Sequence, residues 1–321
     1  PIKSSAASDV YKRQLYVRDG QISTQYIMTT LEELGLLKMD FLGLRTLTVI
    51  QDTINLVKQN RGIDVEFDKD MSDPKVYKLW QEGNTSGIFQ FESQGMTNFM
   101  KELKPDCLED LIAGVSLYRP GPMDQIPRYI RGKQNPGHNE YTHPSLEPIL
   151  NVTYGCMVYQ EQVMQIVRDL AGYSLGRADL VRRAMGKKKL DVMAKEREVF
   201  INGQVDENGN IIVPGCVRNG IDAESANKIF DEMSEFAKYA FNKSHAAAYA
   251  VVAYRTAYLR CHYPVEFMAA LLTSVLGNTN KISEYSYACK KLGIKILPPD
   301  INYGEGAFSV DHGNIRYGLT A

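Results

Sequence analysis

The chain lacks the marks of a secreted, membrane-embedded or disulfide-stabilised protein. Its 321 residues include five cysteines, an odd number, which are widely spaced and never arranged as C-x-x-C. This usage predicts neither a disulfide framework nor a zinc site, and it fits a reducing cytoplasm. No apolar run comes near the roughly 18 residues of a membrane helix, and no signal-peptide pattern opens the sequence. We therefore predict no membrane span and no secretion signal.

The sequence signatures of several common enzyme classes are also missing. It contains no glycine-rich phosphate loop, no G-x-S-x-G and no H-E-x-x-H, so nothing supports an NTPase, a serine hydrolase or a zinc protease. No RNP or KH pattern is present, which disfavours a basic RNA-binding protein. There is no internal repeat and no low-complexity run.

The composition is that of a globular protein, with 44% hydrophobic and 23% charged residues. The formal net charge is −1, but a nucleic-acid-binding protein needs a basic face rather than a basic total. Two stretches provide such faces. Residues 119–133 carry a net charge of +3, and residues 177–189 carry six lysines or arginines against one aspartate. The second run lacks compensating acids, which favours a phosphate-bearing partner over a solvated surface.

Apolar residues at helical spacing dominate the chain and predict a mostly α fold with a small β component (α+β). Expected helices include residues 161–170, ended by Gly172, and a helix capped by Asp222. Further helices are expected around residues 47–57, around residues 249–257 and from Pro264 to about Gly277. A hairpin is expected at residues 206–210 and a strand at residues 295–300.

Two further segments have distinctive patterns. Residues 33–42 alternate apolar and polar side chains, which predicts a strand with Lys38 and Asp40 on one face, about 7 Å apart. The prolines of residues 118–123 predict an extended, rigid loop that holds Arg119. By pattern alone, Asp40 is more often a solvent-facing carboxylate, and Arg119 is equally often paired with an acid in a turn.

Five motifs together carry a resemblance to a known family. The chain resembles the bacterial DNA polymerase III alpha subunits, the C-family replicative polymerases, from about Thr24 to Tyr303. The motifs are Leu-Lys-Met-Asp-Phe-Leu-Gly-Leu-Arg at residues 37–45, Ser-Leu-Tyr-Arg-Pro-Gly-Pro-Met at residues 116–123, Tyr-Gln-Glu-Gln-Val-Met at residues 159–164, Leu-Val-Arg-Arg-Ala-Met-Gly-Lys-Lys-Lys at residues 180–189, and Phe-Ala-Lys-Tyr-Ala-Phe-Asn-Lys-Ser-His-Ala-Ala-Ala-Tyr at residues 236–249.

The resemblance implies a polymerase fingers domain together with the C-terminal part of a palm domain. Residues 15–60 correspond to the end of the palm and residues 61–294 to the fingers. Residues 295–321 form a strand or linker toward a missing C-terminal domain. Residues 1–14 have no periodicity and lie outside the resemblance, so we expect a foreign or disordered extension there.

By resemblance, the parent protein is a DNA-directed DNA polymerase that adds deoxynucleotides to a primer 3′-hydroxyl by two-metal phosphoryl transfer. Asp40 matches the last of the three catalytic aspartates and would bind Mg²⁺. The family carries the other two upstream in a P-D-x-D-x-D motif, which this sequence lacks. One carboxylate cannot hold two magnesium ions, so we expect a fragment that is inactive alone.

The resemblance also implies the nucleotide contacts. The tyrosine would stack on a base, the histidine would crowd a 2′-hydroxyl, and the cations would contact phosphates. The expected nucleotide-binding residues are Lys38, Arg119, Arg182, Arg183, Tyr239, Asn242, Lys243, Ser244 and His245, and the expected DNA-phosphate contacts are Lys187, Lys188 and Lys189.

Several of these residues have more ordinary explanations. A basic run is more often a solvated face, and Tyr239 could be a core aromatic, although Phe236 and Ala240 fit the buried stripe better. Glu161 and its neighbouring glutamines favour a structural role at a helix start. The expected partners are primer-template DNA and dNTPs and, through segments absent here, a sliding clamp and other replicase subunits. The alternative function is a non-catalytic nucleotide- and DNA-binding module.

Overall fold

The computed structural model describes residues 15–321 with the exception of residues 38, 40–42, 187–189 and 238. The chain divides into two compact units, residues 1–44 and residues 45–321. Helices make up most of the described residues and the strands form small sheets, so the predicted mostly α fold with a small β component is confirmed.

The described part of the first unit is a hairpin followed by a short helix. Strands β1 (Leu15–Arg18) and β2 (Gln21–Thr24) pair antiparallel, and both turn residues, Asp19 and Gly20, have positive φ, as a type I′ turn requires. Helix α2 (Met28–Glu33) follows.

The strand predicted over residues 33–42 is not formed by the described residues of that range. Glu33 ends α2, and residues 34–37 and 39 belong to no strand. Gly35, with φ +79°, and Leu36 donate backbone hydrogen bonds back into α2, so the helix terminus uses residues that alternation assigned to a strand. Lys38 and Asp40 lie outside the described residues.

The second unit is built from helices, with α13 the longest in the described chain. Its helices are α3 (Arg45–Arg61), α4 (Pro74–Glu82), α5 (Gln94–Leu103), α6 (Leu108–Leu117), α7 (Ile126–Gln134), α8 (Glu147–Leu150), α9 (Gln160–Ala171), α10 (Leu175–Gly186), α11 (Leu190–Asn202), α12 (Ala223–Phe236), α13 (Lys243–His262), α14 (Pro264–Ser274) and α15 (Thr279–Lys291). Three 3₁₀ turns, η1 (Pro122–Gln125), η2 (Pro144–Leu146) and η3 (Asn151–Thr153), connect them. The strands are β3 (Gln204–Val205), β4 (Ile211–Val213), β5 (Ile296–Leu297), β6 (Ser309–Asp311) and β7 (Asn314–Arg316).

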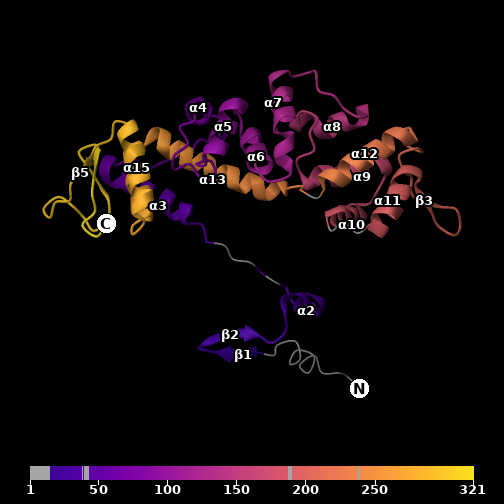
Figure 1. Cartoon of the computed structure of the whole chain (residues 1–321), viewed down its shortest axis with the longest axis horizontal. Coiled ribbons are helices and arrows are strands. Elements are labelled where there is room, and N and C mark those ends of the chain that lie inside the picture. The colour runs from indigo at the N-terminus through magenta and orange to yellow at the C-terminus, as the bar shows by residue number, and fades with distance from the viewer. Residues whose placement is uncertain (1–14, 38, 40–42, 187–189, 238) are drawn as a thin grey trace. The chain divides into compact units, whose positions relative to one another are not determined.

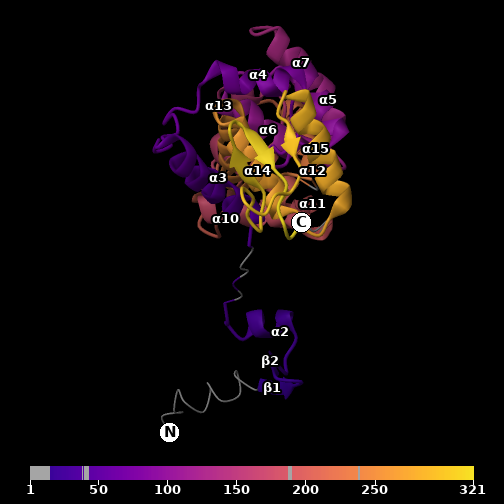
Figure 2. The same cartoon turned by 90° about the vertical axis from the view of Figure 1, so that its left-hand side faces the viewer.

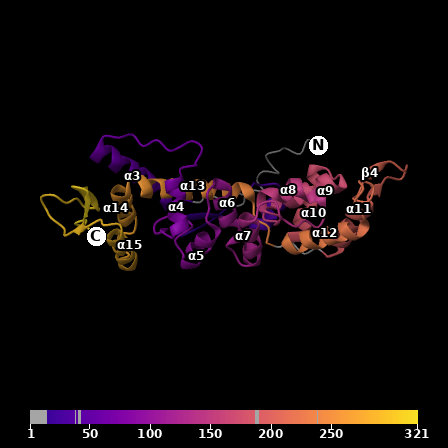
Figure 3. The same cartoon turned by 90° about the horizontal axis from the view of Figure 1, so that it is seen from above.

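Three clusters of buried side chains hold the second unit together. The first lies between α4, α5, α6 and α13, the second among α8 to α12, and the third among α3, α14, α15 and the C-terminal strands. Figures 1 and 3 show the first cluster between the other two, with α13 running along it. Cys156 and Val158 enter the first cluster and Met157 enters the second, so this short segment joins the two cores.

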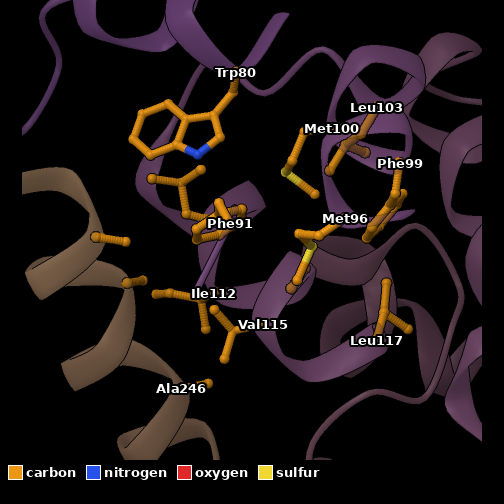
Figure 4. Packing of buried hydrophobic residues seen from close by; sticks show 14 of the residues in the cluster. Trp80, Phe91, Met96, Phe99, Met100, Leu103, Ile112, Val115, Leu117 and Ala246 are labelled. Atoms are coloured by element: carbon orange, nitrogen blue, oxygen red, sulfur yellow. The ribbon is translucent and has the colours of Figure 1, made fainter. Parts of the chain in front are cut away.

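The first cluster fixes the start of α13. Helix α6 is buried from Asp110 to Leu117, and α13 packs on it through Ala246, Ala250, Ala253 and Ala257, which are all fully buried. Alanines at this spacing form one smooth face that lets the two helix axes approach closely. Larger side chains of the same cluster, among them Met96, Phe99 and Met100 of α5, lie on the side of α6 away from α13 (Figure 4). The first turn of α13 and the loop after α6 are therefore both anchored by the same packed pair of helices.

The C-terminal strands form a small mixed sheet on α14 and α15. The strand order is β5-β7-β6, with β5 parallel and β6 antiparallel to β7. Figure 2 shows these strands in front of α14 and α15. The strand predicted at residues 295–300 is confirmed for residues 296–297, and Pro264 begins α14 as predicted.

Most predicted boundaries in the second unit are confirmed. Gly172 ends α9 with φ +77°, and residues 206–210 form the β3–β4 turn. The Asp222 carboxylate accepts a hydrogen bond from the Ser225 amide at 2.9 Å, a cap worth about 1 kcal/mol. One correction concerns residues 118–123, which are not extended throughout, because Pro122 begins the turn η1. Among the described residues, no helix is both long and apolar enough to cross a membrane.

Candidate functional site

Eight of the predicted site residues lie in described parts of the second unit, and they come from three segments. Arg119 follows α6, Arg182 and Arg183 lie on α10, and the rest lie on the turn before α13 or on its first residues. These last residues are Tyr239, Asn242, Lys243, Ser244 and His245. The predicted residues Lys38, Asp40, Lys187, Lys188 and Lys189 lie outside the described residues.

The segment that precedes α9 anchors the turn before α13. Phe241 forms a parallel bridge with Tyr159: its amide donates to the Val158 carbonyl at 3.4 Å, and its carbonyl accepts from the Gln160 amide at 2.9 Å. The Glu161 carboxylate accepts from the Lys243 amide at 3.0 Å. Residues 158–161 thus hold both sides of the turn, as the structural role predicted for this motif requires.

Local contacts occupy Asn242 and Lys243. The Asn242 side chain caps α13 by accepting from the His245 amide at 2.8 Å, and its amide group donates to Glu161 at 3.0 Å. The Lys243 ammonium forms an ion pair with Glu109 at 3.1 Å and lies 5.1 Å from the centre of the Tyr159 ring. The Lys243 ammonium is therefore already paired with Glu109 within the site.

The arginines of α10 share one carboxylate. Asp179 accepts from Arg182 at 2.7 Å and from Arg183 at 2.8 Å, at the i+3 and i+4 spacings that place side chains on one helix face. The hydrogen bond from Arg182, together with the charges of both arginines, lowers the pKa of Asp179 below its usual value. The expectation that this basic run lacks compensating acids was wrong, because Asp179 pairs with both guanidinium groups.

Gln160 connects α10 to the turn before α13. Its side-chain oxygen accepts from Arg182 at 3.0 Å, while its side-chain amide donates to the Ala240 carbonyl at 2.9 Å. Arg182 is therefore held at both ends of its guanidinium, by Asp179 and by Gln160. Arg183 has the more exposed side chain of the two, with 63% of its surface accessible against 22%.

Arg119 has a different environment from the α10 arginines. Its guanidinium lies over the Phe241 ring, 4.4 Å from the ring centre, a cation–π arrangement. Within the described part of the chain, no carboxylate lies within ion-pair distance of Arg119. Its hydrogen-bond donors therefore face solvent on the side away from the ring.

Gly121 and Tyr239 determine the shape of the loop that carries Arg119. Gly121 has φ +102°, and a Cβ built there would lie 2.4 Å from Cδ1 of the Tyr239 ring, so only glycine fits. Tyr239 packs one ring face on this glycine and remains 48% exposed, which confirms the predicted exposure. The loop and the turn therefore touch through an aromatic ring.

His245 projects from the first turn of α13 between two rings. Its ring centre lies 5.4 Å from that of Phe241 and 4.2 Å from that of Tyr249. The side chain is exposed, as is that of Ser244. His245 and Tyr249 lie four residues apart on one face of α13, and Phe241 lies just before the helix.

A pocket of about 460 Å³ lies beside Tyr239, between η1 and α12. Pro122, Met157 and Phe236 give it an apolar lining, and its charged lining consists of Asp124, Glu232, Glu235 and Arg128. Three carboxylates against one guanidinium disfavour a phosphate in this pocket. A larger hollow of about 1030 Å³ beyond Arg128 is lined by none of the predicted site residues.

The described residues do not form a site that fits Mg²⁺. Their only cluster at metal-ligand spacing is Asp106, Cys107 and Asp110. The Lys133 ammonium already binds both carboxylates, at 2.8 Å to Asp106 and 2.6 Å to Asp110, so a cation would have to displace it. Lys133 also belongs to the basic stretch of residues 119–133, so its charge is not free for a phosphate.

Sequence reasoning missed Asp179 and Phe241 as parts of the site. The helical spacing of Asp179 to the two arginines was a usable signal. Phe241 precedes α13, so no helical spacing relates it to His245. The contacts of Gln160 and Glu161 had no such signal, because they join segments about eighty residues apart.

Fold and site together define a helical domain that presents arginine, lysine and aromatic side chains at the start of a long helix. Residues 46–208 match the family model described as the bacterial DNA polymerase III alpha subunit finger domain. The chain belongs to this family.

Several curated relatives are similar along nearly the whole chain. The DNA polymerase III subunit alpha of Thermus aquaticus is 49% identical over 310 residues, which cover 95% of this chain and 24% of the relative. The Bacillus subtilis (strain 168) protein of the same name is 45% identical over 304 residues, covering 94% and 26%. That of Aquifex aeolicus is 46% identical over 308 residues, covering 95% and 25%. The chain thus spans about a quarter of the length of these relatives.

Proposed function

We propose that this chain is part of a DNA-directed DNA polymerase in which it binds the incoming dNTP and part of the primer-template DNA. The observation that carries this proposal is the convergence of three segments on the turn before α13, where Arg119 lies over Phe241, Arg182 bonds to Gln160 and the Lys243 amide bonds to Glu161. They bring Arg119, Arg182 and Lys243 to the turn before α13, beside exposed His245 and Tyr239. Relatives named DNA polymerase III subunit alpha support the same class of activity.

Each side chain has a role that its environment allows. Arg119 and Arg182 offer guanidinium donors to the triphosphate, and Arg183 and Lys243 add charge nearby. Tyr239 offers an exposed ring face to a base, which any base can use. His245 occupies space beside the sugar and excludes a 2′-hydroxyl by crowding. Ser244 and Asn242 border the sugar and the triphosphate.

Catalysis belongs to the parent protein in this proposal. Asp40 would be one of the carboxylates that hold Mg²⁺, which would assist phosphoryl transfer, and Lys38 would contact the triphosphate next to it. Lys187, Lys188 and Lys189 contact DNA phosphates without sequence preference. The described residues do not form a site that fits Mg²⁺. Their proposed roles are therefore to bind and orient the nucleotide and to exclude a 2′-hydroxyl.

Substitution of Asp40 tests the proposal. In a full-length polypeptide that carries this segment, Asp40→Asn is expected to abolish dNTP incorporation and to leave primer-template affinity nearly unchanged, because it removes a metal ligand and not a DNA contact. Primer extension and fluorescence anisotropy with labelled DNA measure the two quantities.

A matched control is Asp19→Asn, in the β1–β2 turn where asparagine suits the positive φ equally well. Retained incorporation by the Asp40→Asn protein would overturn the assignment. If the full-length wild-type protein binds DNA and dNTPs but never extends a primer, the alternative of a non-catalytic nucleotide- and DNA-binding module is correct.

A further inference from the structure

Five side chains form a continuous series of ring and cation contacts along the start of α13. The Arg119 guanidinium lies 4.4 Å from the centre of the Phe241 ring. Phe241 meets His245 edge to face at 5.4 Å, His245 lies on Tyr249 at 4.2 Å, and Tyr249 meets Phe89 at 5.1 Å. We call this series the aromatic ladder. Phe241 is its only member in contact with both Arg119 and His245.

The Phe241 ring has a fixed position, because its backbone is held on both sides. Its amide and carbonyl bond to Val158 and to Gln160, in the segment that joins the first two cores. The ring itself packs half-buried against the first core. By contrast, the side chains of Arg119 and His245 are exposed and have few other contacts to limit their rotamers.

We infer that Phe241 is a positioning residue, which orients Arg119 toward the triphosphate and His245 toward the sugar of the incoming nucleotide. An arginine loses substantial rotamer freedom when it binds a phosphate, and a ring that holds the guanidinium beforehand reduces that loss. Because no carboxylate of the described residues pairs with Arg119, the ring holds the guanidinium without occupying its hydrogen-bond donors. The same ring also contacts His245, with the two ring planes nearly perpendicular, and so limits the positions that the imidazole can take.

This inference rests on the proposed function, but its geometric part can be tested without any activity. The ring currents of the two flanking rings are expected to displace the imidazole proton signals of His245 from their values in a free imidazole. In the 321-residue chain, Phe241→Leu is expected to change that displacement, while Phe89→Leu is expected to leave it nearly unchanged, because within the ladder Phe89 meets Tyr249 and not His245. Loss of the signal in His245→Gln assigns it among the five histidines.

The functional part needs a full-length polypeptide that carries this segment. Phe241→Leu keeps an apolar side chain and removes the ring face. We expect the KM for dNTP to rise roughly two- to fivefold, the range of an exposed cation–π contact, with kcat nearly unchanged. The preference for dNTP over rNTP is expected to fall as well, because His245 loses its edge contact.

Two further variants separate positioning from packing. Phe241→Tyr retains the ring and is expected to restore both the KM and the sugar preference. Phe89→Leu removes a half-buried ring of the same size from the far end of the ladder and is expected to behave like the wild-type protein. Equal losses in Phe241→Leu and Phe89→Leu would show a packing effect and overturn the inference.

A double-variant cycle tests whether Phe241 acts through Arg119. In an Arg119→Gln background, Phe241→Leu is expected to have little further effect on the KM, while it still lowers the sugar preference. Additive effects on the KM would overturn the inference. If Arg119→Gln alone leaves the KM unchanged, the proposed role of Arg119 fails, and the imidazole shifts then report only the geometry. Unchanged imidazole shifts in Phe241→Leu would overturn the ladder itself.

Discussion

Arg119 and Arg182 bring the same chemical group to the turn before α13, but the protein holds them by different means. Arg182 is bound by the Asp179 carboxylate at 2.7 Å and by Gln160 at 3.0 Å, whereas Arg119 lies over the face of Phe241. A carboxylate uses the same donors that a phosphate would use, and a ring face does not. An arginine held by a ring therefore keeps its donors available for an anionic ligand. With an arginine held by a carboxylate, the ligand must compete with that carboxylate for the same donors.

The largest expected effect comes from removing the ring-supported cation. In a full-length polypeptide carrying this segment, Arg119→Gln is expected to raise the KM for dNTP at least about tenfold, as a charged hydrogen bond worth roughly 1.5–3 kcal/mol predicts. Arg183→Gln should cost clearly less, because Arg183 shares Asp179. Steady-state primer extension measures both.

The control is Arg197→Gln, which removes a guanidinium that also lies on a phenylalanine ring, that of Phe230 at 4.8 Å, but pairs with Asp231 on α12. It should behave as wild type. Equal losses in Arg119→Gln and Arg183→Gln would mean that the kind of support makes no difference.

The fold of the second unit was largely predictable, because its signals are local. Helix ends depend on interactions with neighbouring backbone groups. The predicted helix ends at Asp222, Gly172 and Pro264 are all present in the structure. The strand predicted over residues 33–42 is wrong for the described residues 33–37 and 39, for a local reason too. Alternation over a few residues does not distinguish a strand from a helix terminus, and Gly35 favoured the terminus.

The residues of the candidate site were predictable from motifs, but their partners were not. Lys243 depends on Glu161 and Glu109, which lie far away in sequence, and no spacing rule relates them. Asp179 was accessible to reasoning, since it lies on the helix face of both arginines. A sum of charges over residues 177–189 counts Asp179 as one negative charge and ignores its position relative to the two arginines.

Removal of the competing acid should move affinity in the opposite direction. Asp179→Asn frees Arg182 and Arg183, so we expect the affinity for dNTP to rise a few-fold and its dependence on salt to become steeper. Titrations at several salt concentrations measure both quantities. Asp231→Asn, which frees Arg197 away from the site, is the matched control and should change neither. Weaker binding in Asp179→Asn would show that the carboxylate orients the arginines instead of competing for them.

A smaller gain is expected at Lys243. Its ion pair with Glu109 is partly exposed, with 35% and 52% of the two side chains accessible, so the pair is weak. Glu109→Gln should therefore tighten dNTP binding by about twofold at most. Glu224→Gln breaks a comparable pair with Lys228 on α12 and provides the baseline. A loss of affinity in Glu109→Gln would mean that this glutamate holds the ammonium in its binding position.

The smallest effect is a pH dependence of stability that separates the two kinds of support. The hydrogen bond from Arg182 lowers the folded-state pKa of Asp179, so this pair stabilises the fold above the unfolded-state pKa, about 3.9, and loses its contribution as pH falls through the lower folded-state value. The stability difference between wild type and Asp179→Asn, at most about 1 kcal/mol, should be constant from pH 8 to pH 5 and should shrink below about pH 4. Urea denaturation of the two proteins at each pH measures it. Phe241→Leu has no carboxylate to titrate, so its difference from wild type should stay level across the same range, and a parallel decline in both would contradict the distinction between acid-held and ring-held arginines.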